Sequence, residues 1–419
     1  MKFSIKQSEL NRGLEPVFMV STTAGENEFE DLGWVTIEAS KDSLVASAYN
    51  GKAAIVNKIT EHYSFGEAGS PVTLNTKEFM STVASFSPDE IIDFVITDSE
   101  AQLIPQSDSS QMQAVPFNNK VIQVPQFATT FTKQVHINRE RFSKAVNKVA
   151  AAVGNLKFKP EFFYWIARFS ANRIRTVAGD GSRFIIYQIE GENLVDAKGE
   201  ISFVVHKDFN PIVQKLLAKG PETITFSEYV KKNDEDTEGA STQTVFEIGS
   251  IRLMLLAHDP TTKWPNEEKF LVRQNPIKFT VDASEWVYPL NGVKATYNDD
   301  VSRANKIHFA SMKMDFNKKM IVVEAESTMK SKRKVRISDV DVPEGQEDLE
   351  FSCVSDYLKD MLSLCSGEEH MQFEFVDNKA PVIVRYYAKD VVQQDRPVKD
   401  AGGFKEECTI FFASFNKKQ

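Results

Sequence analysis

The chain has 419 residues, of which 42% are hydrophobic and 26% are charged, and it carries a formal net charge of −9. This length and balance are typical of a soluble globular protein with about two to four domains, and the acidic balance excludes a general attraction to nucleic acid. No segment approaches the ~20 consecutive apolar residues of a membrane-spanning helix.

The N-terminal residues and the cysteines indicate the cellular compartment of the protein. The first ten residues, MKFSIKQSEL, alternate apolar and polar residues and lack the apolar core of a secretory signal. Cys353, Cys365 and Cys408 are odd in number and widely spaced, which argues against a disulfide framework. We therefore predict a cytoplasmic protein, with Cys353 packed in a strand and Cys365 near the end of the helix that follows.

A strand followed by a helix recurs three times along the chain. The copies are MKFSIKQSELNRGLEPVF from Met1, KQVHINRERFSKAVNKVAAAVG from Lys133 and PIKFTVDASEWVYPLNGVKATY from Pro276. Each begins with an alternating strand and continues through a polar capping residue to apolar residues at helical spacing. In the middle copy the apolar stripe is Phe142, Ala145, Val146 and Val149.

A strand–helix–strand pattern alternates with the first one, and Phe79, Phe209 and Tyr357 occupy the same place in its three copies. We therefore predict an α+β protein of three similar tandem domains, each with two helices on antiparallel strands. The polar, proline-containing segments QVPQFATTFTKQ and KFLVRQNP predict the boundaries. The predicted domains are residues 1–125 (domain I), 133–272 (domain II) and 276–419 (domain III).

Motifs of catalysis are missing from the sequence. There is no P-loop, GxGxxG, GxSxG, HExxH or paired CxxC. His136 and His206 flank predicted helix starts, which favours surface or capping roles over catalysis. Residues 233–236 lack the glycine and the terminal glutamate of an EF-hand loop. We predict no catalytic residue, no metal and no cofactor. An enzyme with a clustered acidic site, such as one at Asp299 and Asp300, ranks third, behind the two non-catalytic hypotheses given below.

A turn is predicted in the middle of TVAGDGSRFIIY, residues 176–187, because glycine tolerates positive φ and aspartate bonds its own backbone. The whole chain resembles the bacterial DNA sliding clamp, the β subunit of the replicative DNA polymerase. The N-terminal MKFSI…L…LEPV, with Pro16 inside the first helix, resembles the opening of that family. IRTVAGDGSRF resembles its signature L-x-x-V-A-T-D-G-x-R-L, and YLKDML, residues 357–362, resembles its YLxDxL.

The resemblance implies a non-catalytic processivity factor. Two chains would meet head to tail, domain I against domain III, in a ring whose helices face double-stranded DNA without sequence preference. Its partners would be the replicative polymerase and the clamp loader. The residues expected to face DNA are Arg139, Arg141, Lys144 and Lys148 on the first helix of domain II, and Lys207, Lys215 and Lys219 on the second.

The resemblance also implies a pocket between domains II and III that accepts a short apolar peptide of partner proteins. Carried over by motif, its residues are Phe162, Gly179, Gly181, Ser182, Arg183, Phe184, Pro260, Val354, Tyr357, Phe412, Ala413 and Ser414. The sequence departs from the family at Gly179, where threonine is usual, at Ser182, where histidine is common, and in the C-terminal FFASFNKKQ. The alternative hypothesis is a clamp-like module that competes for clamp partners without encircling DNA, since domain I carries few unopposed basic residues.

Overall fold

The computed structural model describes residues 1–23, 33–97, 100–118, 122–125, 127, 131–154, 160–181, 183–191, 196–197, 200–231, 241–255, 264–271, 276–285, 309–326, 332–337, 340, 348–354, 369–376, 381–388 and 405–412. They fall into two compact units. The first comprises Met1–Ser143, Phe169–Ala171 and Val195–Asp259, and the second Lys144–Arg168, Asn172–Leu194 and Pro260–Gln419. Among the described residues, no helix is long and apolar enough to cross a membrane.

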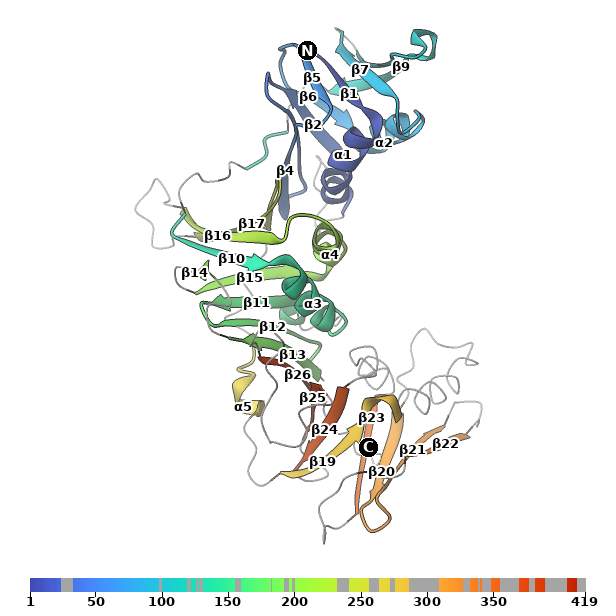
Figure 1. The fold of residues 1–419 in the computed structure, drawn as a ribbon, viewed down its shortest axis with the longest axis vertical. Helices are drawn as coiled ribbons and strands as arrows, with labels where there is room; N and C mark the ends of the chain where they lie inside the picture. The colour runs from blue at the N-terminus through green and yellow to red at the C-terminus, as the bar shows by residue number, and fades with distance from the viewer. Residues whose placement is uncertain are drawn as a thin grey trace. The chain divides into compact units, whose positions relative to one another are not determined.

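The first unit holds three helices and the start of a fourth. They are α1 (Gln7–Thr22), α2 (Thr76–Ala84), α4 (Asn210–Ala218) and α3 (Arg139–Ala150), the last of which continues into the second unit. The side chain of Asn75 caps α2 by accepting from the backbone N–H groups of Lys77 and Glu78. Helix α1 contains Pro16, as expected, and packs on β2, β3 and β4 and against α2 (Figure 1).

One antiparallel sheet runs through the first unit. Its hydrogen-bonded order is β14 (Asp196–Ala197), β10 (Lys133–Asn138), β16 (Thr223–Lys231), β17 (Ser241–Ile248), β18 (Ile251–Leu255), β4 (Ala53–Ile59), β3 (Leu44–Tyr49), β2 (Trp34–Ala39), β6 (Val72–Asn75), β9 (Gln113–Asn118), β8 (Glu100–Pro105), β7 (Ile91–Ile96), β1 (Lys2–Lys6) and β5 (Tyr63–Glu67). The unit also contains β15 (Ile201–His206) and the short 3-10 helices η1 (Ser109–Gln111) and η3 (Lys207–Phe209). Because β18 pairs with β4, hydrogen bonds cross the boundary predicted between domains I and II.

The core of the first unit is built from aromatic rings. The centroid of Phe226 lies 4.7–5.2 Å from those of Phe142, Phe169, Phe203 and Phe246, and all five side chains are almost fully buried. Such contacts add to the stability gained by burying the rings. The predicted stripe of α3 is confirmed, since these residues are all buried: Phe142, Ala145, Val146 and Val149.

The predicted repeats are visible in the order of elements. The strand–helix–strand pattern appears as β6–α2–β7 and as β15–η3–α4–β16, with Phe79 and Phe209 buried at matching places. His206 caps η3, because its Nδ1 accepts from the backbone N–H of Asp208 at 3.3 Å. The predicted strand position of Cys353 is confirmed in β23, whereas Tyr357, Cys365, residues 233–236 and residues 299–300 lie outside the described residues.

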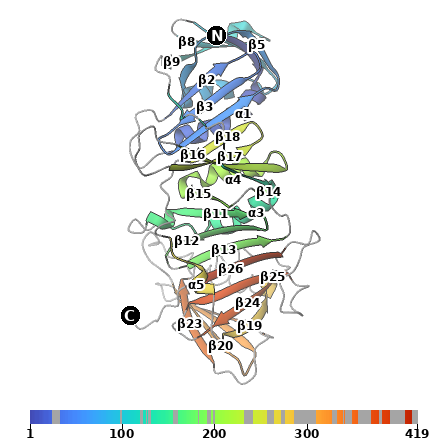
Figure 2. The same cartoon turned by 90° about the vertical axis from the view of Figure 1, so that its left-hand side faces the viewer.

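The second unit contains a long antiparallel sheet and a smaller one. The long sheet includes, in order, β11 (Tyr164–Ser170), β12 (Arg173–Gly179), β13 (Arg183–Glu190), β26 (Lys405–Phe412), β25 (Val382–Ala388), β24 (Glu369–Phe375) and β19 (Ile277–Asp282), as Figure 2 shows. The smaller sheet has the order β22 (Lys332–Ile337), β21 (Met320–Glu326), β20 (Phe309–Asp315) and β23 (Leu349–Val354). A 3-10 helix, η2 (Pro160–Phe163), precedes β11, and a short helix, α5 (Glu268–Leu271), precedes β19.

Candidate functional site

The hairpin predicted at residues 176–187 is confirmed. Strands β12 and β13 pair from Arg173 with Glu190 to Gly179 with Phe184. The backbone N–H of Asp180 donates to the carbonyl of Arg183 at 3.2 Å, and Gly181 adopts a φ of 86°. Glycine is suited to this position because side chains with a Cβ are strained at positive φ.

Arg183 holds this turn from within the protein. Its backbone N–H and its Nε donate to the two carboxylate oxygens of Asp180 at 3.0 and 3.1 Å. Its terminal nitrogen donates to the carbonyl of Ala151, just beyond α3, at 3.1 Å. Because the residue is only 8% exposed, its guanidinium positions the hairpin and does not extend into solvent.

Three aromatic side chains lie beside the turn. Phe162 contacts Phe184 at a centroid distance of 5.7 Å. Trp264 contacts both of them, at 5.5 and 6.1 Å, in edge-to-face geometry. We call Phe162, Phe184 and Trp264 the aromatic cluster. The sequence reasoning included the two phenylalanines and missed Trp264, although its position five residues before the predicted boundary segment KFLVRQNP was a usable signal.

Two glycines allow the chain to approach the hairpin closely. The backbone N–H of Gly154 donates to the carbonyl of Phe162 at 2.8 Å, and a Cβ on Gly154 would lie 2.9 Å from the Cα of Asp180. A Cβ on Gly179 would lie 2.8 Å from the carbonyl oxygen of Arg183. Neither position has room for a side chain unless the backbone moves.

The remaining residues of the predicted pocket are partly described. Phe412 pairs with Arg183 in the register of β26 and β13, so the last strand does reach the hairpin. Val354 ends β23 in the smaller sheet, where it pairs with Phe309. The other predicted residues lie outside the described part of the chain: Ser182, Pro260, Tyr357, Ala413 and Ser414.

The basic residues predicted to face DNA lie on α3, on η3 and on or just after α4. Lys144 forms an ion pair with Glu406, and Lys215 forms one with Glu15. Arg139 donates to the carbonyl of Leu217 at 2.6 Å. Leu217 lies in the last turn of α4, where the helix dipole stabilises a positive charge. The two ion pairs offset part of the charge that the sequence assigns to the two helices.

Four further basic residues complete the predicted set. Arg141 and Lys148 on α3 and Lys207 on η3 are partly exposed, and Lys219, which follows α4, is exposed. Among the described residues, no group of histidine, cysteine, aspartate or glutamate side chains could hold a metal ion.

The chain has the fold of the bacterial DNA sliding clamps. A DNA polymerase sliding clamp from Pseudomonas aeruginosa, crystallised with a ligand, matches it with a TM-score of 0.77 at 13% identity, over 99% of this chain and 100% of that one. A clamp of the same organism bound to griselimycin gives 0.75 at 12% identity, over 99% of each chain. The pol III beta of Caulobacter crescentus gives 0.76 at 14% identity, over 99% of this chain and 100% of that one. The sequence matches no protein-family model, and no curated protein matches it.

Proposed function

We propose that this chain is a sliding clamp that encircles duplex DNA and tethers the replicative polymerase. The observation that carries the proposal is a match to the clamp fold over 99% of the chain, at identities as low as 12%. Two copies would close the ring head to tail, domain I against domain III, since heterologous contacts form rings when their rotation closes.

A clamp of this kind performs no chemistry. Enclosing the DNA converts each rebinding of the polymerase into an effectively intramolecular event, which raises its local concentration. The topological link needs little affinity, so an overall charge of −9 is compatible with the function. Basic residues near the DNA would supply a weak, sequence-independent attraction to phosphates.

We further propose that the hairpin and the aromatic cluster form part of the site that docks partner peptides. The cluster packs three apolar rings, each at most 9% exposed, beside polar groups of fixed position, and this mixture of apolar and polar groups is the usual composition of a ligand site. Arg183 would act indirectly, by fixing the turn that carries Phe184. Polymerase and clamp loader would compete for this site through short apolar segments.

The ring is tested by mass and by DNA topology. We expect a particle of about twice 47.3 kDa that a clamp loader leaves on nicked circular DNA and that is lost when the circle is cut. A strict monomer that binds partner peptides but is not retained on circles would contradict the ring and favour the clamp-like competitor.

A further inference from the structure

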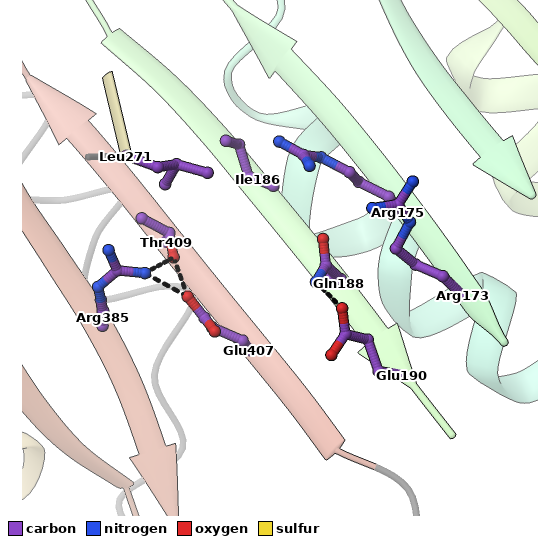
Figure 3. A pocket seen from close by; sticks show the side chains of 9 residues that line it. All are labelled: Arg173, Arg175, Ile186, Gln188, Glu190, Leu271, Arg385, Glu407 and Thr409. Carbon is purple, nitrogen blue, oxygen red and sulfur yellow. Dashed lines mark hydrogen bonds and ion pairs between the residues drawn. The ribbon is translucent and has the colours of Figure 1, made fainter. Parts of the chain in front are cut away.

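A second polar site adjoins the aromatic cluster within the same unit. It is a cavity of about 280 Å³ whose lining includes Arg168, Arg173, Arg175, Trp264 and Glu267. Arg173 and Arg175 also line a cavity of about 310 Å³ over the sheet, where they lie on β12 across from Gln188 and Glu190 of β13 (Figure 3). Trp264 therefore belongs both to the aromatic cluster and to a cavity rich in arginine.

Trp264 has a hydrogen-bond donor without an acceptor. The residue is only 8% exposed, and its Nε1 has no hydrogen-bond partner among the residues that the structure describes. A buried donor without an acceptor is costly, and such groups are rare in native structures. The indole N–H therefore needs an acceptor, which a ligand in the cavity lined by Trp264 would supply.

The charge of the same cavity favours an anion. Its lining carries three guanidinium groups and one carboxylate, that of Glu267. Glu267 is shared, because Arg168 contacts its Oε1 and a terminal nitrogen of Arg175 lies 3.6 Å from that atom.

Arg173 supplies positive charge that Glu267 does not offset. Within the described part of the chain its guanidinium makes no hydrogen bond or ion pair, although Glu190 lies opposite it in the register of β12 and β13. Glu190 accepts instead from Gln188 Nε2 at 2.6 Å. On the far side of the second cavity, Arg385 contacts Glu407 (Figure 3).

We propose that this cavity binds the carboxylate of an acidic residue in the same partner peptide whose apolar residue docks on the aromatic cluster. The inference rests on the proposed docking function. Arg173 would give a charge-assisted hydrogen bond, and the indole N–H of Trp264 a second one. A peptide, and not a free anion, fits best because Trp264 forms a wall of both sites, so neighbouring residues of one chain can occupy them together.

The experiment uses the full chain and paired synthetic peptides. Each acetylated and amidated hexapeptide carries a Leu-Phe pair, with glutamate or glutamine scanned through the four other positions. We expect that, at one position or more, the glutamate peptide binds about tenfold more tightly than its glutamine twin. Arg173→Gln and Trp264→Phe should each remove most of that preference, while Lys278→Gln, on β19 and outside this cavity, should keep it.

Spectroscopy supplies a second readout. The Trp264 N–H signal in ¹⁵N-indole spectra is assigned by its loss in Trp264→Phe. This signal should move downfield when the glutamate peptide binds and should not move downfield when the glutamine peptide binds. Equal affinities of the twins for the wild type would overturn the carboxylate site and leave the docking function standing. Absence of binding by every peptide would overturn both.

Discussion

The ring of Phe184 lies where a side chain on Gly179 would have to go. A Cβ on Gly179 would come within 2.7 Å of Phe184 Cδ1, and the two residues are paired across β12 and β13. The family signature that this segment resembles, L-x-x-V-A-T-D-G-x-R-L, has threonine and leucine at these two positions. The glycine at 179 and the phenylalanine at 184 are therefore one coupled change, in which a larger ring on β13 takes the space of a side chain on β12.

A double substitution tests this coupling. We expect Gly179→Thr alone to lower the free energy of unfolding by about 1–3 kcal/mol through overpacking. Phe184→Leu should lower it less, and the double variant should recover much of the loss, because the smaller leucine makes room for threonine. Denaturant unfolding of the four proteins measures the coupling. Strictly additive effects would show that the two residues do not compete for one space.

The contacts of Arg183 predict that lysine cannot replace it. Lysine carries a point charge and cannot bond the carboxylate of Asp180 and the carbonyl of Ala151 together as a guanidinium does. We expect Arg183→Lys to cost about 1–2 kcal/mol of stability and to weaken binding of apolar peptides, because the turn carrying Phe184 loosens. The exposed Arg336→Lys on β22 is the control. Unchanged peptide affinity in Arg183→Lys would contradict a role of Arg183 in the docking site.

Local patterns in the sequence predicted local structure well. The stripe of Phe142, Ala145, Val146 and Val149 follows from helical spacing alone, and the turn at Asp180 and Gly181 from the backbone preferences of two residues. Both features depend on neighbours within a few positions, so a single sequence contains the information for them.

Contacts between distant segments could not be predicted in the same way. Trp264 reaches Phe162 from about a hundred residues away, and Glu406 reaches Lys144 across 262 positions. Such contacts depend on the register of β13 with β26 and on the path of the chain before β19. Spacing within one sequence does not encode either of these, which is why Trp264 was missed and Lys144 was assigned its full charge.

The junction of β18 with β4 depends on a buried amide. Asn57 is 3% exposed; its Nδ2 donates to the carbonyl of Gly13 and its Oδ1 accepts from Ser250 Oγ, both at 2.7 Å. We expect Asn57→Ala to lower the free energy of unfolding by about 1–3 kcal/mol, because a buried carbonyl loses its donor. Ser250→Ala, at an exposed position, should cost less. Thermal unfolding of the full chain measures both changes, and the reverse order would contradict this role for Asn57.

The pair of Lys144 and Glu406 predicts that DNA retention can be raised as well as lowered. Glu406 accepts from Tyr187 Oη at 2.8 Å as well as pairing with Lys144, and glutamine can keep the first contact without the charge. We expect Glu406→Gln to increase retention on circular DNA and to steepen its salt dependence by up to about one unit of slope, since Lys144 becomes available to a phosphate.

Opposite changes on α3 should act in the opposite direction. Lys144→Glu, or Arg141→Glu combined with Lys148→Glu, should reduce both retention and salt slope. Lys313→Glu on β20, which changes the net charge by the same amount as Lys144→Glu, should change neither. Retention is measured by gel filtration of loaded circles over a series of salt concentrations. If the α3 variants and the β20 control behaved alike, net charge would explain the effect and α3 would not face DNA. If retention rises with Glu406→Gln on β26 and falls with the α3 variants, while the β20 control changes nothing, α3 must lie next to the duplex.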